Sequence, residues 1–302
     1  MALSTPESAT TSAWPAVPGA RGRFRGRVGI TRFGRSRSAV VGLAIVLGLT
    51  LLSLAAPLAA PYDPLATVPG EQFRPPSLAH PFGTDQFGRD LLSRTIWGGR
   101  TSLAVAGLAV GIAALVGFPL GLWAGYFSRS FVNTAVMRLT DMVLAFPPIL
   151  LAMVIVAILG PGTQSVTVSI AIVSIPPLTR LARAAMLTQL GSDYVTATRT
   201  AGASDRHIIF RAILPNCLPP ILVQVALAAG TAILLEAALS FLGLGTQPPA
   251  PSWGSMLYDA RSYLAHAPWY GIFPGVFITL LILGLDALAT GLRDALDPSH
   301  RS

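Results

Sequence analysis

The feature that most constrains this chain is the length of its stretches without a charged side chain. A bilayer core requires about 20 apolar residues per helical span, because unpaired backbone groups in hydrocarbon are costly. A soluble helix of that length shows a polar face, and these stretches show none. Only 11% of the residues are charged, which fits a polytopic membrane protein and excludes a soluble one. The uncharged stretches lie between Arg37 and Asp63, Arg100 and Arg129, Asp141 and Arg180, Arg211 and Glu236, Glu236 and Asp259, and Arg261 and Asp286.

The stretches predict an all-α membrane protein with six transmembrane helices. The uncharged run 142–179 is too long for one helix, and the turn signal Gly160-Pro161-Gly162 divides it into a third and a fourth span. Proline pairs at 147–148 and 176–177 predict kinks in these two helices. The other spans are predicted at about residues 38–60, 101–127, 218–245 and 269–292.

The arginines predict the orientation and the division of the chain. With the N-terminus in the cytoplasm, sixteen arginines fall in cytoplasmic segments and five in external ones, which is the expected positive-inside bias. We therefore expect an inner-membrane protein with both termini cytoplasmic, in contact with lipid and not with nucleic acid. The small residues before Pro61 also fit a signal-peptide cleavage site, but the long preceding tail favours a retained helix. The predicted parts are a basic tail 1–37, a first helix with its external loop 38–100, a five-helix unit 101–292 and a tail 293–302.

The chain lacks the motifs of an energy source or a catalyst. A P-loop needs a lysine that reaches the phosphates, and this sequence contains no lysine. The four histidines are scattered, at positions 80, 207, 266 and 300, so no metal site is predicted. The single cysteine, Cys217, is expected to be a small buried side chain. We expect no enzyme activity and no cofactor in this chain.

The longest predicted cytoplasmic loop, residues 191–216, has a helix–turn–helix pattern. Residues 194–201 suit a short helix, and Gly202 stands where a left-handed residue would end it. Ser204 can cap a second helix, with Asp205 at its positive end. Pro215 is expected to end that helix before the membrane. The loop either lies on the lipid surface or docks a partner protein.

This loop resembles the signature loop of binding-protein-dependent ABC importer permeases. Ala197, Gly202, Leu214 and Pro215 stand at the offsets of the family pattern, while Thr196, Thr198 and Ala212 depart from it. Further stretches resemble the C-type subunit of the dipeptide, oligopeptide and nickel permeases, over about residues 38–298. They are FGTDQFGRDLLSRTIWGGRTSL, AGASDRHIIFRAILPN, EAALSFLGLGTQPPAPSWGSML and GLRDALDP.

The resemblance implies a type I importer fold and a set of partners. A homologous B-type permease would complete the pore, two ATP-binding subunits would bind ATP and Mg, and an extracytoplasmic binding protein would deliver the solute. The loop would seat a coupling helix on an ATPase. Its implied docking residues are Tyr194, Ala197, Ala201, Gly202, Ala203, Ser204, Asp205, Arg206, Ile209, Arg211, Leu214 and Pro215. The solute class stays open among dipeptides, longer peptides and nickel chelates.

Three further groups of residues are candidates for function. Glu236 and Ser240 in the fifth span either line the pathway or form a structural polar contact, because intramembrane acids usually face a cavity or a partner. Pro249 and Trp253 either receive the binding protein or belong to an ordered external cap. In the sixth span Asp286, Ala289 and Thr290 replace the Asn and the Gly-Asp pair of the family, which leaves the role of these positions open. A secondary transporter acting alone is the second hypothesis, and a membrane enzyme the third.

Overall fold

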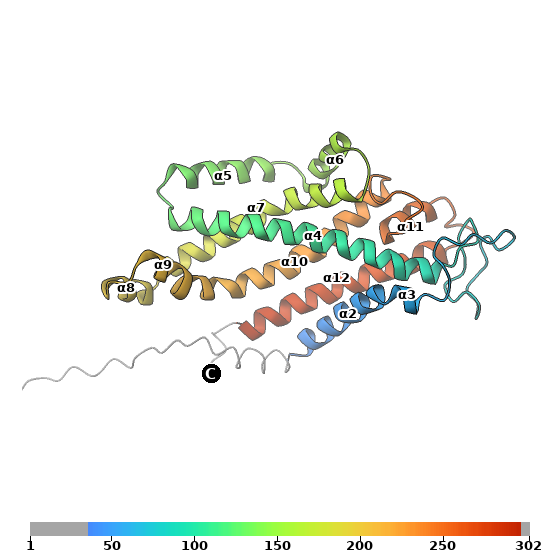
Figure 1. Cartoon of the computed structure of the whole chain (residues 1–302), viewed down its shortest axis with the longest axis horizontal. Helices are drawn as coiled ribbons and strands as arrows, with labels where there is room; N and C mark the ends of the chain where they lie inside the picture. Colours follow the sequence, from blue (N-terminus) through green and yellow to red (C-terminus); the bar gives the residue numbers. More distant parts are fainter. Residues whose placement is uncertain (1–35, 297–302) are drawn as a thin grey trace, which may run out of the picture.

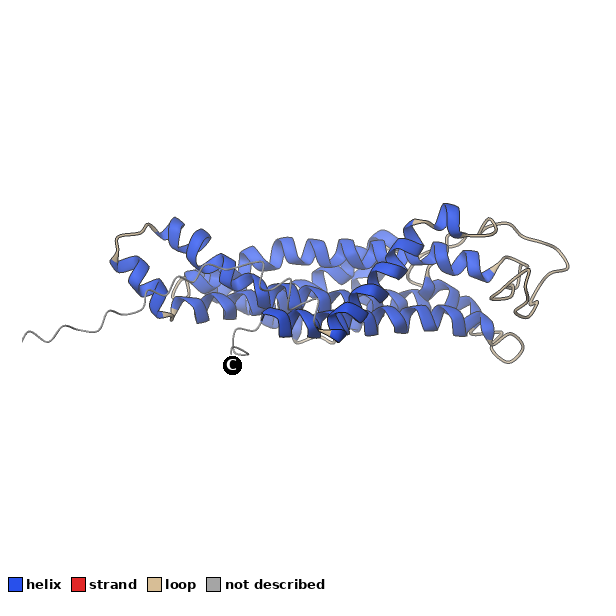
Figure 2. Cartoon of the chain, turned by 90° about the horizontal axis from the view of Figure 1, so that it is seen from below, coloured by secondary structure: helices blue, strands red, loops and turns tan. Residues whose placement is uncertain are grey.

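The computed structural model describes residues 36–296. The predicted tail 1–37 therefore lies outside the described residues except for its last two positions, as does the predicted C-terminal tail beyond residue 296. The described part is helical, with one isolated bridge between Thr84 and Asp90 (Figure 2). Its helices are α2 (Arg37–Leu54), α3 (Ala56–Ala59), α4 (Leu91–Tyr126), α5 (Phe131–Leu144), α6 (Pro148–Leu159), α7 (Thr163–Leu190), α8 (Asp193–Thr200), α9 (Asp205–His207), the π-helical turn η1 (Ile208–Ile213), α10 (Leu214–Phe241), α11 (Trp253–Ala260) and α12 (Trp269–Leu296).

The sequence predicts six spans, and the structure has five or six. Within the described residues, five helices are long and apolar enough to cross a membrane, and the bent pair α5–α6 gives the sixth when it is counted as one span. The two helices of that pair meet at 92°, beside the proline pair 147–148. The pair 176–177 instead lies inside the unbroken helix α7. The predicted kink is therefore confirmed as a break at the first proline pair only.

Two predicted span boundaries were wrong because charged residues were assigned to loops. Helix α4 begins at Leu91, ten residues before the predicted start at 101, with Asp90 as its N-cap. The side chain of Asp90 accepts a hydrogen bond from the Ser93 nitrogen, which satisfies a free donor of the first turn. Helix α5 occupies 131–144, most of which was assigned to a loop before the third span.

Small residues bring the spans into close contact. Gly117, Gly121 and Gly125 recur every four residues along α4, and the backbone or Cβ atoms of α7 fill the space where their Cβ atoms would lie. Helix α2 packs along α12 in the same way, since a Cβ on Gly42 would lie 2.5 Å from the Leu288 nitrogen. Helix α10 contacts α4, α7 and α12, so it lies at the centre of the bundle.

The two ends of the bundle carry different structures (Figure 1). Helices α8 and α9 form one end, where α4 and α7 finish and α10 begins. Helices α3 and α11 and the loop 60–90 form the opposite end. We call the α8–α9 end the inner end and the other the outer end.

Candidate functional site

The coupling element, residues 191–216, forms the inner end as the sequence predicts. Helix α8 carries Asp193 in its first turn and Arg199 in its last, which complements the helix dipole. Gly202 follows with a φ of +81°, the left-handed conformation that glycine adopts cheaply. The Ser204 side chain accepts a hydrogen bond from the His207 nitrogen at 3.4 Å and caps α9. The predicted helix, glycine turn and serine cap are confirmed.

Pro215 does not end the second helix, contrary to the sequence prediction. The helix runs without interruption from Asp205 to Phe241, and Pro215 lies in the first turn of α10. The π-helical turn η1 precedes it, with the Leu214 nitrogen donating to the Ile209 carbonyl. A proline ring clashes with the carbonyl four residues earlier in an α-helix. The wider π turn accommodates the ring, and π turns of this kind are frequent at functional sites.

An apolar cluster fixes the coupling element to the spans. Val195 of α8 and Ile208 and Ile213 of η1 are at most 1% exposed, and they pack with Met186 of α7. Cys217 of α10 belongs to the same cluster and is fully buried, so the lone cysteine has a packing role. One side of the element is therefore held by α7 and α10.

The hydroxyl of Tyr194 joins three helices by hydrogen bonds. It donates to the Gln189 side-chain oxygen at 2.6 Å and accepts from the Asn216 side-chain nitrogen at 3.3 Å. Asn216 also donates to the Ala212 carbonyl inside the π turn at 2.8 Å. Burial raises the pKa of the Tyr194 phenol, so the hydroxyl keeps its proton at neutral pH. This contact links the end of α7 and the start of α10 to α8. No local sequence pattern points to Gln189 or Asn216 as its partners.

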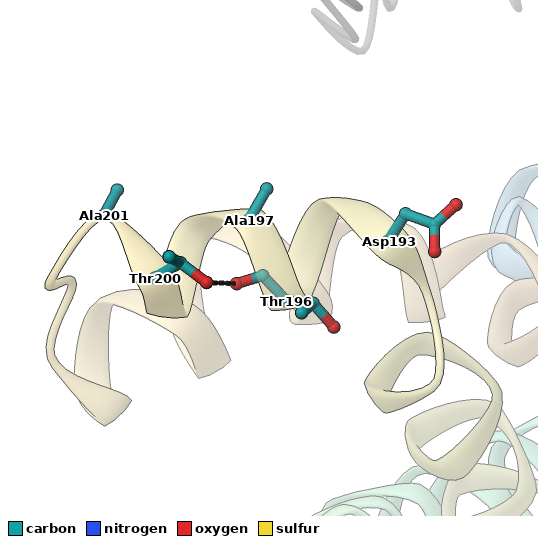
Figure 3. A pocket seen from close by; sticks show the side chains of 5 residues that line it. All are labelled: Asp193, Thr196, Ala197, Thr200 and Ala201. Atoms are coloured by element: carbon teal, nitrogen blue, oxygen red, sulfur yellow. Dashed lines mark hydrogen bonds between the residues drawn. The ribbon is translucent and has the colours of Figure 1, made fainter.

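The opposite side of α8 is exposed in the part of the chain that the structure describes. Asp193, Ala197 and Ala201 project to one side at a spacing of four residues, and with Thr196 and Thr200 they line a shallow open hollow (Figure 3). The Thr200 hydroxyl is bonded to the Thr196 carbonyl at 2.9 Å, so it is turned back onto its own helix. Of the predicted docking residues, Tyr194, Ala197, Ala201, Gly202, Ser204, Asp205, Arg206 and Arg211 are exposed, and Ala203, Ile209, Leu214 and Pro215 are half-buried.

Glu236 and Ser240 are buried in this chain. They are 1% and 2% exposed, and the Ser240 hydroxyl donates to Glu236 Oε1 at 2.9 Å. Ser102 of α4 and Ser252 of the outer loop adjoin the same carboxyl group. The burial and the hydrogen bond fit the structural alternative, and the assignment of these residues to the pathway stays a prediction. Neither side chain presents a surface to a solute.

Trp253 is likewise buried and offers no surface to a binding protein. Its indole nitrogen donates to the Thr95 carbonyl at 2.8 Å, and its backbone nitrogen donates to the Ser102 hydroxyl at 3.2 Å. The side chain is 0% exposed. Trp253 therefore fastens α11 to α4, which corrects its assignment as a contact residue. Pro249 is exposed on the outer loop.

A buried ionic cluster orders the outer loop 60–90, and sequence reasoning missed it. Asp85 is fully buried and accepts from Arg89 Nε at 2.6 Å, while Arg94 Nε lies 3.5 Å away. His80 lies between Asp90 and Glu71, at 2.9 and 3.2 Å. The only sequence signal was the balance of four acids and four arginines over residues 61–100, which predicted no net charge there.

Comparison with known proteins assigns the family. The profile described as "Binding-protein-dependent transport system inner membrane component" matches residues 117–302. A second profile, "N-terminal TM domain of oligopeptide transport permease C", matches residues 26–76. The chain belongs to this permease family. Its resemblance to the family, derived from the signature loop, is confirmed.

Individual relatives are similar over most of their length. The dipeptide transport system permease protein of Alkalihalophilus pseudofirmus is 45% identical, covering 89% of this chain and 88% of the relative. The di/tripeptide transport system permease protein of Pseudomonas aeruginosa is 47% identical, covering 89% and 91%. The inward-facing MetNI methionine ABC transporter is similar in fold, with a TM-score of 0.59 and 17% identity, over 68% of this chain and 98% of that chain. This permease therefore has the fold of an ABC transporter membrane component.

Proposed function

We propose that this permease is the C-type subunit of an ATP-driven importer of peptides. The relatives at 45% and 47% identity are named for dipeptide and for di- and tripeptide transport, which favours short peptides over nickel chelates. Its partners are a homologous B-type permease, two ATP-binding subunits and an extracytoplasmic solute-binding protein. This chain binds no cofactor, since ATP and Mg are held by the ATP-binding subunits.

One observation carries the coupling role: a small-residue helix stands on a fixed base at one end of the bundle with one side free. The base is the apolar cluster around Val195 and Ile208, and the free side is formed by Asp193, Ala197 and Ala201. Small side chains allow an ATPase surface to approach the backbone closely. The exposed Arg206 and Arg211 would add electrostatic complementarity to an acidic groove. A displacement of α8 by the ATPase would then move α7 and α10 together.

We infer that the inner end faces the cytoplasm. The arginine bias of the sequence supports this orientation. The outer arginines Arg89 and Arg94 are committed to a buried cluster with Asp85, so they do not act as free topology signals. The outer loop, with Pro249 exposed, would then receive the solute-binding protein.

The substitution Gly202→Asp tests the docking role. Gly202 has a φ of +81° and open space where a Cβ would lie, so the fold has room for the new side chain. The left-handed backbone costs an aspartate about 1–2 kcal/mol at most. In the assembled transporter reconstituted in liposomes, we expect assembly to persist and peptide uptake per ATP hydrolysed to fall about tenfold or more, because the contact is blocked.

Gly70→Asp is the matched control. Gly70 has a φ of +85° and the same open surroundings, but it lies in the outer loop. Equal uptake by the two variants at an unchanged ATPase rate would refute the docking role. A loss of assembled complex in Gly202→Asp alone would support it as well, because the two backbone penalties are alike.

A further inference from the structure

One face of α12 stays uncovered by the other residues in the range 36–296. Helix α2 covers the side that carries Gly42's contacts, Gly284 and Leu288, and α10 covers Leu285 and Ala289. Between these sides lies a row of exposed residues at alternating spacings of four and three, which is one face of a helix. The row consists of Ile272, Val276, Thr279, Leu283, Asp286 and Thr290.

Asp286 lies inside the membrane-spanning part of this face. Gly291 touches Ala39 at the start of α2, and Gly284 touches Ile45 further along it. With a rise of about 1.5 Å per residue, Asp286 lies about 7 Å deeper than Gly291. Its neighbour Ala289 packs on Val223 and Ala226, in the uncharged part of α10. The Asp286 carboxylate therefore lies at the depth of the apolar part of α10 and deeper than the basic start of α2.

A carboxylate at this depth does not face lipid hydrocarbon. Intramembrane acids face a partner or a water-filled cavity, and an aspartate is too short to reach the interface as lysine or arginine does. Among residues 36–296 the ion pairs involve other acids, and none includes Asp286. Thr279 and Thr290 lie on the same face, and the Thr279 hydroxyl donates to the Gly275 carbonyl of its own helix. Within the described part of the chain, the face therefore carries one carboxylate without an intrahelical or interhelical ion pair, between threonine and aliphatic side chains.

We propose that Asp286 lines the translocation pathway and binds the ammonium group of a solute, such as the free amino terminus of a peptide. This inference rests on the proposed importer function. Asp286 and Thr290 are one helical turn apart on the exposed face, so the Thr290 position lies close to the carboxylate.

The first test measures whether the face meets water. Single cysteines replace Asp286, Thr279 or Leu51 in the complete reconstituted transporter, and membrane-impermeant charged thiol reagents are applied. Native Cys217 is buried and gives a low background. We expect labelling at positions 286 and 279 and none at Leu51, which is 61% exposed on the apolar helix α2. An unlabelled position 286 would overturn the proposal and indicate a contact with the partner permease.

The second test measures the charge. In a Thr290→Cys background, a cationic reagent should react faster than an anionic one, and Asp286→Asn should lower that ratio about tenfold, because one nearby unit charge is removed. Uptake of a dipeptide with a free amino terminus should fall by a similar factor in Asp286→Asn and persist in Asp286→Glu, at unchanged affinity of the binding protein.

Asp294→Asn is the matched control for the uptake measurement. Asp294 is exposed on the same helix, two turns nearer the inner end and past Gly291. Uptake by Asp286→Asn equal to that of Asp294→Asn would refute solute binding. If Asp286 fails this test while Gly202→Asp still uncouples ATP hydrolysis, the importer function stands and only the pathway assignment falls.

Discussion

The buried carboxylate of Asp85 should carry much of the stability of the outer end. It accepts hydrogen bonds from the backbone nitrogens of Phe87 and Arg89 at 2.8 and 3.0 Å, besides its contacts with the Arg89 and Arg94 guanidinium groups. Asp85→Asn keeps the shape and one acceptor but removes the charge. Two arginines that are 7% and 2% exposed then lose their nearest anion.

The magnitude follows from breaking a buried ion pair. Removing one partner of such a pair costs about 3–5 kcal/mol, because the other charge stays buried without compensation. For a chain of this size each kcal/mol corresponds to roughly 2–4 °C in Tm. We expect Asp85→Asn to lower the midpoint of thermal unfolding of the detergent-purified permease by about 6–20 °C, read from tryptophan fluorescence.

The control is an exposed aspartate–arginine ion pair elsewhere in the chain. Asp141 and Arg180 are ion-paired with side chains 54% and 51% exposed, so Asp141→Asn should cost under about 1 kcal/mol. In a double-mutant cycle, Asp85→Asn with Arg89→Gln should show a coupling of about 1–3 kcal/mol. A midpoint for Asp85→Asn within 1–2 °C of the parent would refute the reasoning, as would equal losses for the two aspartates.

Two further predictions concern the inner end. Tyr194→Phe removes the hydroxyl that joins Gln189 and Asn216, so the ATP hydrolysed per peptide imported should rise about two- to tenfold. The control Tyr62→Phe loses a hydrogen bond to a carbonyl of the outer loop and should leave this ratio unchanged. In intact cells, impermeant thiol reagents should label Leu78→Cys at the outer end but not Arg129→Cys between α4 and α5; the opposite pattern would invert the proposed orientation.

The spans were predictable from the sequence where charge alone decides the boundary. The sixth span was predicted at 269–292, and α12 occupies Trp269–Leu296. The prediction failed where a charged residue lies inside a helix. Arg94 is 2% exposed and sits beside Asp85, so the tertiary contact allows α4 to start before the uncharged run. Arg138 and Asp141 concealed α5 in the same way, because that helix is amphipathic.

The coupling element was predictable to the extent that its signals are local. A glycine at +81° and a serine cap have signatures within a few residues, so both were found. The Tyr194 contacts reach five residues back and 22 residues ahead, which only the folded chain brings together. The role of Glu236 stayed open between two alternatives because α10 is apolar on every side, so its sequence does not tell which face is covered.

The two ends of the bundle differ in how strongly they resist movement. At the outer end, buried ion pairs around Asp85 and the indole of Trp253 fix α11 and the loop to α4. At the inner end, α8 is held by the apolar cluster around Val195 and by the hydrogen bonds of one exposed tyrosine beside a π turn, with no buried ion pair among the described residues. Segments whose hydrogen bonds are exposed open at lower free energy than the rest of a fold. A force applied to α8 should therefore deform the π turn and tilt α7 and α10 before it disturbs the outer end. A rigid outer loop would let the binding protein dock in one geometry while the passage below it changes shape.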